Sequence, residues 1–367
     1  MVEPGLLFVS DDPETFVGRG KLFAANLPTD GRVARILFDH VNMAPTRMRV
    51  IVMIANKGKV PGRIAFAGIA AGPPDGAPAA KPNDAFRNGM HVGHLATVGF
   101  LKARLVTPGG SIDVPLLGDT PLVLASVELQ PGAATPVKMD GHCVAGIFNF
   151  LSVGNIPCEL RVMACNVDED ETVWDSLPPA ENQRMEENEK ARQADPNVEK
   201  LEFRSGIFDI RGREGFDNPE NEITFDGAIA QLGEAKYPRA AGFPQFDGSA
   251  YKGEYGVIKH FWCDLGGAAQ GRLSQEARGK GNATASYLMN GQLLESSQFG
   301  PGKAYSVGNV TAGDDGIARI VTMAEINSTL PVNLGVTNGT TKLGSVSITR
   351  SRAVIAQGAP PRSAPVA

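Results

Sequence analysis

The residues of this chain that first suggest chemistry are two closely spaced histidines, His91 and His94, in the stretch GMHVGH. On a helix, residues three positions apart lie on one face, so two imidazoles at this spacing could bind a metal ion together. No carboxylate adjoins the pair, and the metalloprotease motif H-E-x-x-H does not occur. The pair is therefore a candidate metal site, with a structural role for both histidines as the competing interpretation.

A second candidate is a run of seven aromatic residues between residues 237 and 262. Aromatic rings on the surface of a β-sandwich can stack on sugar rings or anchor a partner protein. The ligand-binding hypothesis rests on four of these rings: Tyr237, Tyr251, Tyr255 and Trp262. The competing interpretation is that the rings pack in a core or between domains.

Motifs of nucleophilic and cofactor-dependent enzymes are absent. The sequence contains no G-x-S-x-G, no P-loop and no G-x-G-x-x-G that opens a helix, the patterns that position a serine nucleophile, phosphates or a dinucleotide. No catalytic residue and no cofactor is therefore predicted, and the sequence favours a protein that is not an enzyme. Because the two carboxyl groups of a glycosidase are paired in space, a hydrolase with spatially assembled carboxylates stays open as an alternative.

The composition indicates a globular chain of many short elements. Of the 367 residues, 43 are Gly and 26 are Pro, and 42% are hydrophobic, as expected for short elements joined by turns. A net charge of −5 without a basic cluster argues against nucleic acid as a partner.

No apolar run is long enough for a transmembrane segment. The N-terminus lacks the features of a signal peptide, so the chain is either intracellular or a mature form without its leader.

Two stretches share one pattern, Leu129 to Val162 and Phe299 to Val336. Each begins with an apolar residue, a spacer and Pro-Gly, and each ends with a proline followed by an alternating strand. Such alternation places one face of a strand in a core and the other toward water. We therefore predict an all-β protein of two tandem β-sandwich domains, either immunoglobulin-like or jelly-roll.

The first stretch also predicts a strand pairing. If VGNI forms the turn of a hairpin, Phe148 lies opposite Leu160 on the buried face. The same register places Cys143 opposite Cys165, close enough for a disulfide bond, with two reduced thiols as the alternative. Six side chains are expected to occupy matching cores in the two domains: Phe148, Phe150, Leu160 and Val162 in the first, and Leu334 and Val336 in the second.

An acidic stretch divides the chain, because residues 168–200 hold eleven acidic and only four basic residues. A helical stretch that is polar all round usually bridges domains or is solvated. The predicted boundaries are a first sandwich at 1–170, a partly helical acidic linker at 171–200, a second sandwich at 201–356 and a disordered tail at 357–367.

Three shorter segments of the first half carry local signals. Two β-rich runs, 48–55 and 63–70, flank the turn NKGKVPG and are expected to pair as neighbouring strands. Residues 72–84 are rich in Pro, Ala and Gly and predict an exposed loop. Residues 86–105 carry Leu and Val at helical spacing and predict a helix, although its glycines lower the helix propensity.

Several segments in this order resemble a known family. They are SDDPETFVGRGKLFAANLPTDGR, MRVIVMIANKGKVPGRIAFAGIAAGPPDGA, the LQPG segment and GSAYKGEYGVIKHFW. The resemblance is to an uncharacterised family of exported, β-rich proteins found mainly in cyanobacteria, a domain of unknown function. It covers most of both halves and implies export of the mature chain. It carries over no activity and no catalytic residue, and the acidic linker departs from the pattern expected of that family.

These observations favour a non-enzymatic exported protein that acts by binding or assembly at the cell envelope, in the periplasm or outside the cell. Its expected partners are glycans or other envelope proteins, with self-assembly as a further option. The alternatives are a carbohydrate-binding module that uses the aromatics at 237–262, the hydrolase described above, and a subunit of a surface layer or filament built through exposed strand edges. A cytoplasmic location is also compatible with the N-terminus.

Overall fold

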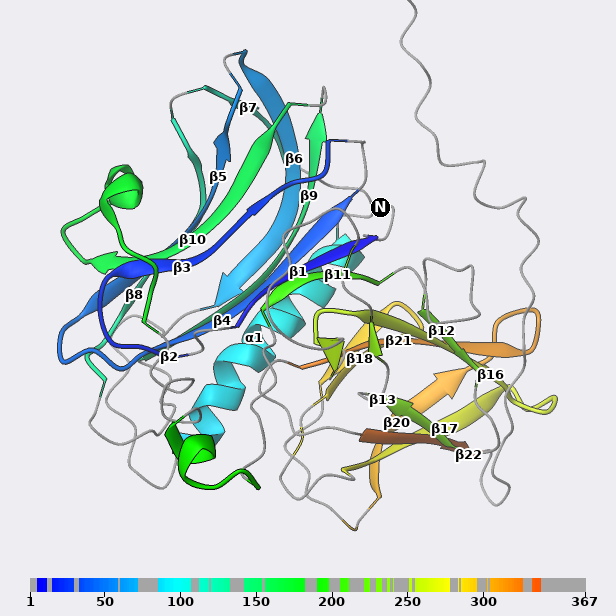
Figure 1. The fold of residues 1–367 in the computed structure, drawn as a ribbon. Coiled ribbons are helices and arrows are strands. Elements are labelled where there is room, and N and C mark those ends of the chain that lie inside the picture. Colours follow the sequence, from blue (N-terminus) through cyan, green and yellow to red (C-terminus); the bar gives the residue numbers. More distant parts are fainter. Residues whose placement is uncertain are drawn as a thin grey trace, which may run out of the picture.

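The computed structural model is built mostly of β-strands (Figure 1). It describes residues 5–11, 15–29, 33–58, 60–71, 85–106, 112–118, 120–132, 142–153, 156–181, 190–197, 205–210, 221–224, 229–232, 236–237, 240, 251–252, 255–277, 283, 285–295, 302, 304–325 and 332–337. The predicted loop at 72–84 and the predicted tail at 357–367 lie outside these ranges.

The first half forms a sandwich of two sheets. Sheet A has the strand order β11 (Gly206–Asp209), β1 (Leu6–Ser10), β4 (Ala34–Asn42), β9 (Cys143–Val153), β6 (Gly62–Ala71) and β7 (Ile112–Leu116), and the short β2 (Thr15–Phe16) also pairs with β4. Sheet B has the order β3 (Gly20–Asn26), β10 (Cys158–Asn166), β5 (Met48–Asn56) and β8 (Leu122–Leu129). Strand β11 comes from the segment assigned to the second domain by sequence, yet it extends a sheet of the first half.

The second half forms another pair of sheets. Sheet C has the order β12 (Asn221–Thr224), β16 (Ile258–Asp264), β21 (Ile317–Ala324), β18 (Ala285–Met289) and β19 (Gln292–Glu295). Sheet D has the order β13 (Ile229–Leu232), β22 (Val332–Thr337), β17 (Gln270–Ala277) and β20 (Tyr305–Thr311). A separate two-stranded ribbon pairs β14 (Lys236–Tyr237) with β15 (Tyr251–Lys252).

The two halves have the same strand order. Sheet A contains the order β1-β4-β9-β6-β7, and sheet C has the corresponding order β12-β16-β21-β18-β19. Sheet B has the order β3-β10-β5-β8, and sheet D has the corresponding order β13-β22-β17-β20. Even the parallel pair is shared, because β1 runs parallel to β4 as β12 runs parallel to β16. In each half, eight of these strands follow the jelly-roll order, and β1 or β12 is added beside them. The prediction of an all-β sandwich architecture is confirmed, and the jelly roll is the form it takes.

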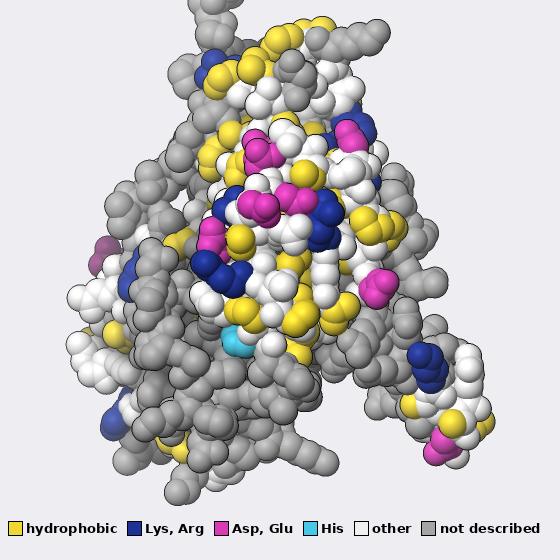
Figure 2. All heavy atoms as spheres, turned by 90° about the vertical axis from the view of Figure 1, so that its left-hand side faces the viewer, with side chains coloured by type: hydrophobic (Ala, Val, Ile, Leu, Met, Phe, Trp, Pro, Cys, Tyr) yellow, Lys and Arg dark blue, Asp and Glu magenta, His cyan; other side chains and the backbone are white. Residues whose placement is uncertain are grey.

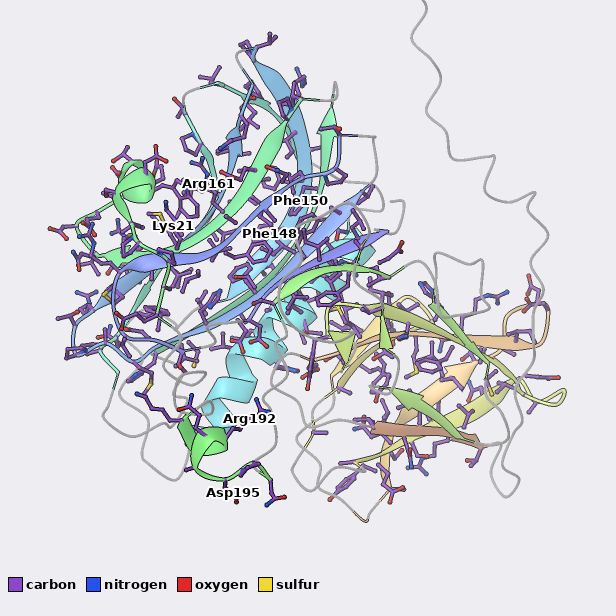
Figure 3. The ribbon with its side chains drawn as sticks, in the orientation of Figure 1. Lys21, Phe148, Phe150, Arg161, Arg192 and Asp195 are labelled. Carbon is purple, nitrogen blue, oxygen red and sulfur yellow. The ribbon has the colours of Figure 1, made fainter. Side chains whose placement is uncertain are left out.

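Each sandwich encloses an apolar core supplied by alternate residues of its strands. In the first half, Phe148 and Phe150 of β9 are buried with Leu160 and Val162 of β10, and the Phe148 ring stacks on Phe38 at a centroid distance of 6.3 Å. Figure 3 shows both β9 phenylalanines between the sheets. In the second half, Leu334 and Val336 are buried in the corresponding core, so the predicted alternation is confirmed on both strands.

The two predicted strand pairings are wrong. Strand β9 bonds to β4 and β6 in sheet A, whereas β10 bonds to β3 and β5 in sheet B. Likewise β5 lies in sheet B and β6 in sheet A. In a jelly roll most consecutive strands belong to opposite sheets, so their turns cross the sandwich and do not close hairpins. Alternation requires a buried face but does not determine the neighbour.

The two Pro-Gly dipeptides are not equivalent. Gly132 follows β8, and a Cβ atom there would lie 2.4 Å from the Met43 Cα atom, so close backbone approach requires glycine. Gly302 precedes β20, has a φ of 77° and has open space around it, so a left-handed turn requires glycine. The dipeptides therefore occupy different connections, and only the strands that end the two stretches, β10 and β22, correspond.

The helix predicted at 86–105 is present as α1 (Ala85–Val106), in the connection between β6 and β7. In the second half, the equivalent connection between β18 and β19 is the two-residue turn Asn290-Gly291, with φ values of 54° and 74°, the sequence pair typical of a tight hairpin. Helix α1 is thus an insertion that distinguishes the two halves. Figure 1 shows it beneath sheet A, on the side of the second half.

Other helical structure is short. A 3-10 helix, η3 (Glu171–Ser176), begins at Asp170, whose carboxylate accepts a hydrogen bond from the Thr172 amide. Within the predicted acidic linker, residues 190–194 are helical. Among the described helices, none is both long and apolar enough to cross a membrane.

Candidate functional site

Helix α1 joins the two sandwiches through one apolar cluster, which we call the junction. Leu7 and Leu37 on the outward face of sheet A, Val92 and Phe100 of α1, and Ile258 of β16 are all buried in it. Because apolar interiors are close-packed, the contact leaves little room for the two halves to move relative to each other. The outward faces of sheets A and C, which sequence alternation assigns to water, are therefore partly covered here.

A buried arginine fixes the junction. Arg35 of β4 has no exposed surface, and its Nε atom donates to Asn149 Oδ1 at 2.8 Å. Its Nη1 atom donates to the carbonyl oxygen of Gly256 in the second half at 2.6 Å. The guanidinium also lies 4.9 Å from the centre of the Phe100 ring of α1, an attractive cation–π distance. One side chain thus connects sheet A, α1 and the second sandwich.

The turn that receives Arg35 is shaped for this contact. Gly256 has a φ of 74°, and a Cβ atom there would lie 2.9 Å from Leu37 Cδ1. Only glycine combines the left-handed backbone with so close an approach to sheet A.

Of the two histidines predicted as a metal site, His94 is the one with a described side chain, and it faces a carboxylate. His94 Nδ1 lies 3.1 and 3.0 Å from the two carboxylate oxygens of Glu325, which has no exposed surface. Glu325 also accepts a hydrogen bond of 2.6 Å from the Ser286 hydroxyl. The side chain of His91 lies outside the described atoms, and no group of three or more metal-binding side chains occurs among the described residues. His94 therefore ties α1 to β18 and β21.

The Ser286, Glu325 and His94 group contains the residue types of a catalytic triad, but not its connectivity. In a triad the imidazole stands between the hydroxyl and the carboxylate, so that it can take the hydroxyl proton. Here the carboxylate stands between the other two and accepts from the hydroxyl on Oε1 while it faces the imidazole. The arrangement orders the junction without activating a nucleophile.

The four predicted aromatic residues fall into separate places. Tyr237 and Tyr251 are cross-strand neighbours in the β14–β15 ribbon. Tyr255 is partly buried and packs against both the second core and the junction. Trp262 lies on β16 opposite Arg319 of β21, between the core residues Phe261 and Cys263, so its position faces away from the core. The packing interpretation holds for Tyr255, and the side chains of the other three lie outside the described atoms.

The predicted disulfide bond is absent, because Cys143 and Cys165 lie in different sheets. Cys143 is buried in the junction on the outward face of sheet A, and Cys165 is buried on the outward face of sheet B. The error follows from the wrong hairpin, since directly opposed residues would need β9 and β10 in one sheet. None of the four cysteines is disulfide-bonded.

Burial predicts that these thiols react slowly in the folded protein. Desolvation raises the pKa of Cys165 and of Cys263 to about 11 each, and nearby acidic groups, Glu169 and Asp264, add to the rise. At pH 8 both groups are therefore protonated, and the thiolate is the reactive form. Titration with a chromogenic disulfide reagent should detect all four thiols after denaturation without reductant and almost none before it. A denatured count lower by two would show that a disulfide bond exists.

The outward face of sheet B is covered by the segment that contains η3. Trp174 is buried there with Met53 and Met163, and its ring lies 5.2 Å from the Lys21 Nζ atom and 5.0 Å from the Arg161 guanidinium. Figure 3 shows Lys21 and Arg161 on neighbouring strands beside this segment. The tryptophan therefore holds a cover over the sheet and is not available to a ligand.

Charged side chains on the same face pair with one another. Arg49 and Arg47 both bind Glu128, at 2.9 and 2.6 Å, and Arg161 binds Glu159 at 2.6 Å. Figure 2 shows acidic and basic side chains gathered together over this side of the molecule. Since opposite charges alternate, the face has no strong preference for an anion or a cation.

Sequence reasoning missed the residues that hold the junction, above all Arg35 and Glu325. In ARILFDHVN, Arg35 and Asp39 alternate with apolar residues, the pattern of a strand with one face in water. The single available signal was that Leu37 and Val41 share the face of those charged residues, which indicates a covered face.

No family model matches the chain, and no curated protein sequence matches it. Solved structures with some likeness include the tandem CBM22 unit of Paenibacillus barcinonensis Xyn10C, at 9% identity and a TM-score of 0.16, covering 82% of this chain and 79% of that one. The human norovirus GI.7 particle gives 12% identity, a TM-score of 0.20, and 90% and 69% coverage. Bacillus subtilis oxalate decarboxylase gives 10% identity, a TM-score of 0.15, and 90% and 76% coverage. Such TM-scores transfer neither a site nor a function to this chain.

Proposed function

We propose that the protein is a non-enzymatic, exported protein of the cell envelope that acts by binding, with its two jelly rolls held as one rigid unit. The observation that supports this is the use of the buried polar groups. Arg35 and Glu325 each make hydrogen bonds that join α1 or one sandwich to the other half, so these groups maintain a shape. The envelope location rests on the resemblance to exported proteins.

A rigid scaffold suits binding because a surface fixed before contact loses little conformational freedom on association. The proposal predicts that the full-length protein binds isolated cyanobacterial envelopes saturably in a sedimentation assay. A matched sample in which the protein is first unfolded and quenched serves as the control for non-specific adhesion. A folded protein that stays entirely in the supernatant, or that hydrolyses envelope glycans, would contradict the proposal.

A second candidate is carbohydrate binding by the second half, which the strand register favours. Tyr237 lies directly opposite Tyr251, and such pairs share one face of a ribbon. Trp262 is paired in register with Arg319, whose guanidinium is ion-paired with Asp315, so the β16–β21 pair brings a tryptophan position next to polar groups. Binding on a glycan array that is lost in Trp262→Ala, and retained in Tyr305→Ala on sheet D, would support this function. Failure to bind any glycan would remove it.

A further inference from the structure

One end of the first sandwich carries apolar side chains that the fold leaves in water. Three connections meet at this end, those between β5 and β6, between β7 and β8, and between β9 and β10, of which residues 57–58, 60–61, 117–118, 120–121 and 156–157 are described. We call it the apolar tip. Val60 is 70% exposed and Leu117 is 49% exposed, and Pro61, Pro121 and Pro157 add further apolar surface that is at least partly exposed.

The tip is held in shape by hydrogen bonds. The buried side chain of Asn56 donates from Nδ2 to the carbonyl oxygens of Val60 and Leu116, at 2.9 and 3.3 Å, and accepts from the Gly58 amide at 2.7 Å. The Lys57 amide donates to the carbonyl oxygen of Pro157 at 2.7 Å. One amide side chain therefore places Val60 beside Leu117, and a backbone bond ties the third turn to them.

Exposure at this tip differs from ordinary surface exposure. Single exposed hydrophobic residues are common and need no explanation. Among the described residues four large hydrophobic side chains are exposed, and two of them, Val60 and Leu117, lie at this one tip, while Leu95 and Tyr305 lie elsewhere. Hydrophobic side chains also gather at the upper end of Figure 2. In Figure 1, β5 and β7 end and β6 begins at this end of the sandwich.

Basic residues flank the apolar ones. Lys57 and Arg63 stand on either side of Val60 in the sequence, with Lys59 between them. The Lys57 side chain is 47% exposed, with Glu159 at 3.6 Å, and Arg63 is exposed. The turn at 57–61 contains Lys57 and Lys59, and Arg63 follows on β6, whereas the neighbouring stretches contribute Asp119 and Glu159, so basic residues are in excess. Exposed apolar residues with an excess of basic neighbours match the interface of an anionic bilayer.

We propose that the apolar tip docks on the surface of an anionic lipid membrane, with Val60 and Leu117 among the lipid headgroups and Lys57 and Arg63 near the lipid phosphates. The inference rests on the proposed envelope function and identifies lipid as what is bound. A membrane is favoured over a protein partner because the two exposed apolar side chains lie in turns at one end of the sandwich and have an excess of basic neighbours.

The test measures binding of the full-length protein to protein-free vesicles. Vesicles of phosphatidylcholine with about one-third phosphatidylglycerol are compared with phosphatidylcholine alone. The wild type should sediment with the anionic vesicles, and Val60→Ser/Leu117→Ser should bind about tenfold more weakly or worse. Lys57→Gln should weaken binding by several-fold and reduce its salt dependence. Leu95→Ser, a matched leucine on α1, should bind like the wild type, and thermal melts confirm that each variant is folded.

Other results overturn the inference. Absence of wild-type binding to anionic vesicles, or equal binding by the double variant, contradicts it. If the wild type is a dimer and the double variant a monomer, with no vesicle binding by either, the tip contacts a second copy of this chain. If the double variant binds isolated envelopes as well as the wild type does, the lipid inference fails while the envelope function stands. If neither binds envelopes, the envelope function fails.

Discussion

Arg35→Ala is expected to lower the free energy of unfolding by about 4 kcal/mol, because it leaves buried acceptors without a donor and opens a cavity at the junction. The side chain has no exposed surface and bonds to Asn149 and to the Gly256 carbonyl oxygen. Urea unfolding followed by tryptophan fluorescence measures the change, and a lower apparent m-value indicates a loss of cooperativity as well as of stability. Since the bond to Gly256 crosses between halves, the variant should also unfold less cooperatively.

Two further substitutions calibrate this result. Arg319→Ala removes an arginine whose side chain is 47% exposed in its pair with Asp315, and exposed pairs contribute little to stability, so little change is expected. Arg35→Lys keeps the charge but loses the planar guanidinium, which donates hydrogen bonds in several directions. The free energy of unfolding of Arg35→Lys should therefore lie between those of the wild type and Arg35→Ala. An Arg35→Ala protein as stable as Arg319→Ala would contradict the role assigned to Arg35.

Gly68→Ala is expected to destabilise the first sandwich by about 3 kcal/mol or more. A Cβ atom at this position of β6 would lie 2.2 Å from the Ile147 carbonyl oxygen and 2.5 Å from the Phe148 Cα atom. These are backbone atoms of β9, the paired neighbour of β6, so no side-chain rotation relieves the overlap. Sheet A must separate locally at its centre, beneath α1, and the thermal unfolding midpoint should fall by several degrees or more.

Gly18→Ala is the matched control for that change. No atom lies within 4 Å of a Cβ atom at Gly18, and its backbone lies outside the left-handed region. The substitution should leave stability unchanged or raise it by up to about 1 kcal/mol, because alanine restricts the unfolded chain. Equal melting temperatures for Gly68→Ala and Gly18→Ala would mean that β6 and β9 are not packed as described.

Local features of the fold could be predicted from local sequence. Alternation in β10 and β22 identified which residues face a core, and Leu160 and Leu334 are buried as expected. Helix α1 followed from apolar residues at helical spacing. These signals work because the periods of strand and helix are properties of the backbone itself.

The arrangement of strands could not be predicted in the same way. Consecutive strands joined by short turns, such as β9 and β10, would ordinarily pair as hairpins, yet they belong to opposite sheets. Their partners lie far along the chain, as β4 does for β9. Nothing in the period of a strand specifies a partner at that distance, so both the pairing and the disulfide bond inferred from it were wrong.

The junction escaped prediction for a related reason. A charged residue on a strand predicts a face in water, yet Arg35 of β4 is buried against α1 and Gly256 of the second half. Glu325, which follows β21, is buried against His94 of α1. The covering helix is an insertion between β6 and β7, whereas Asn290-Gly291 closes the same connection in the second half. Because the strand order could not be predicted, the sequence did not show that α1 stands where the second half has a two-residue turn.

The claim that the two jelly rolls form one rigid unit is tested most directly by calorimetry of the wild type. If the junction couples them, heating should produce one transition with a ratio of calorimetric to van't Hoff enthalpy of about 1. Arg35→Ala should then broaden or split that transition. Two resolved transitions in the wild type, unaffected by Arg35→Ala, would show that the halves unfold independently and that the junction does not couple them.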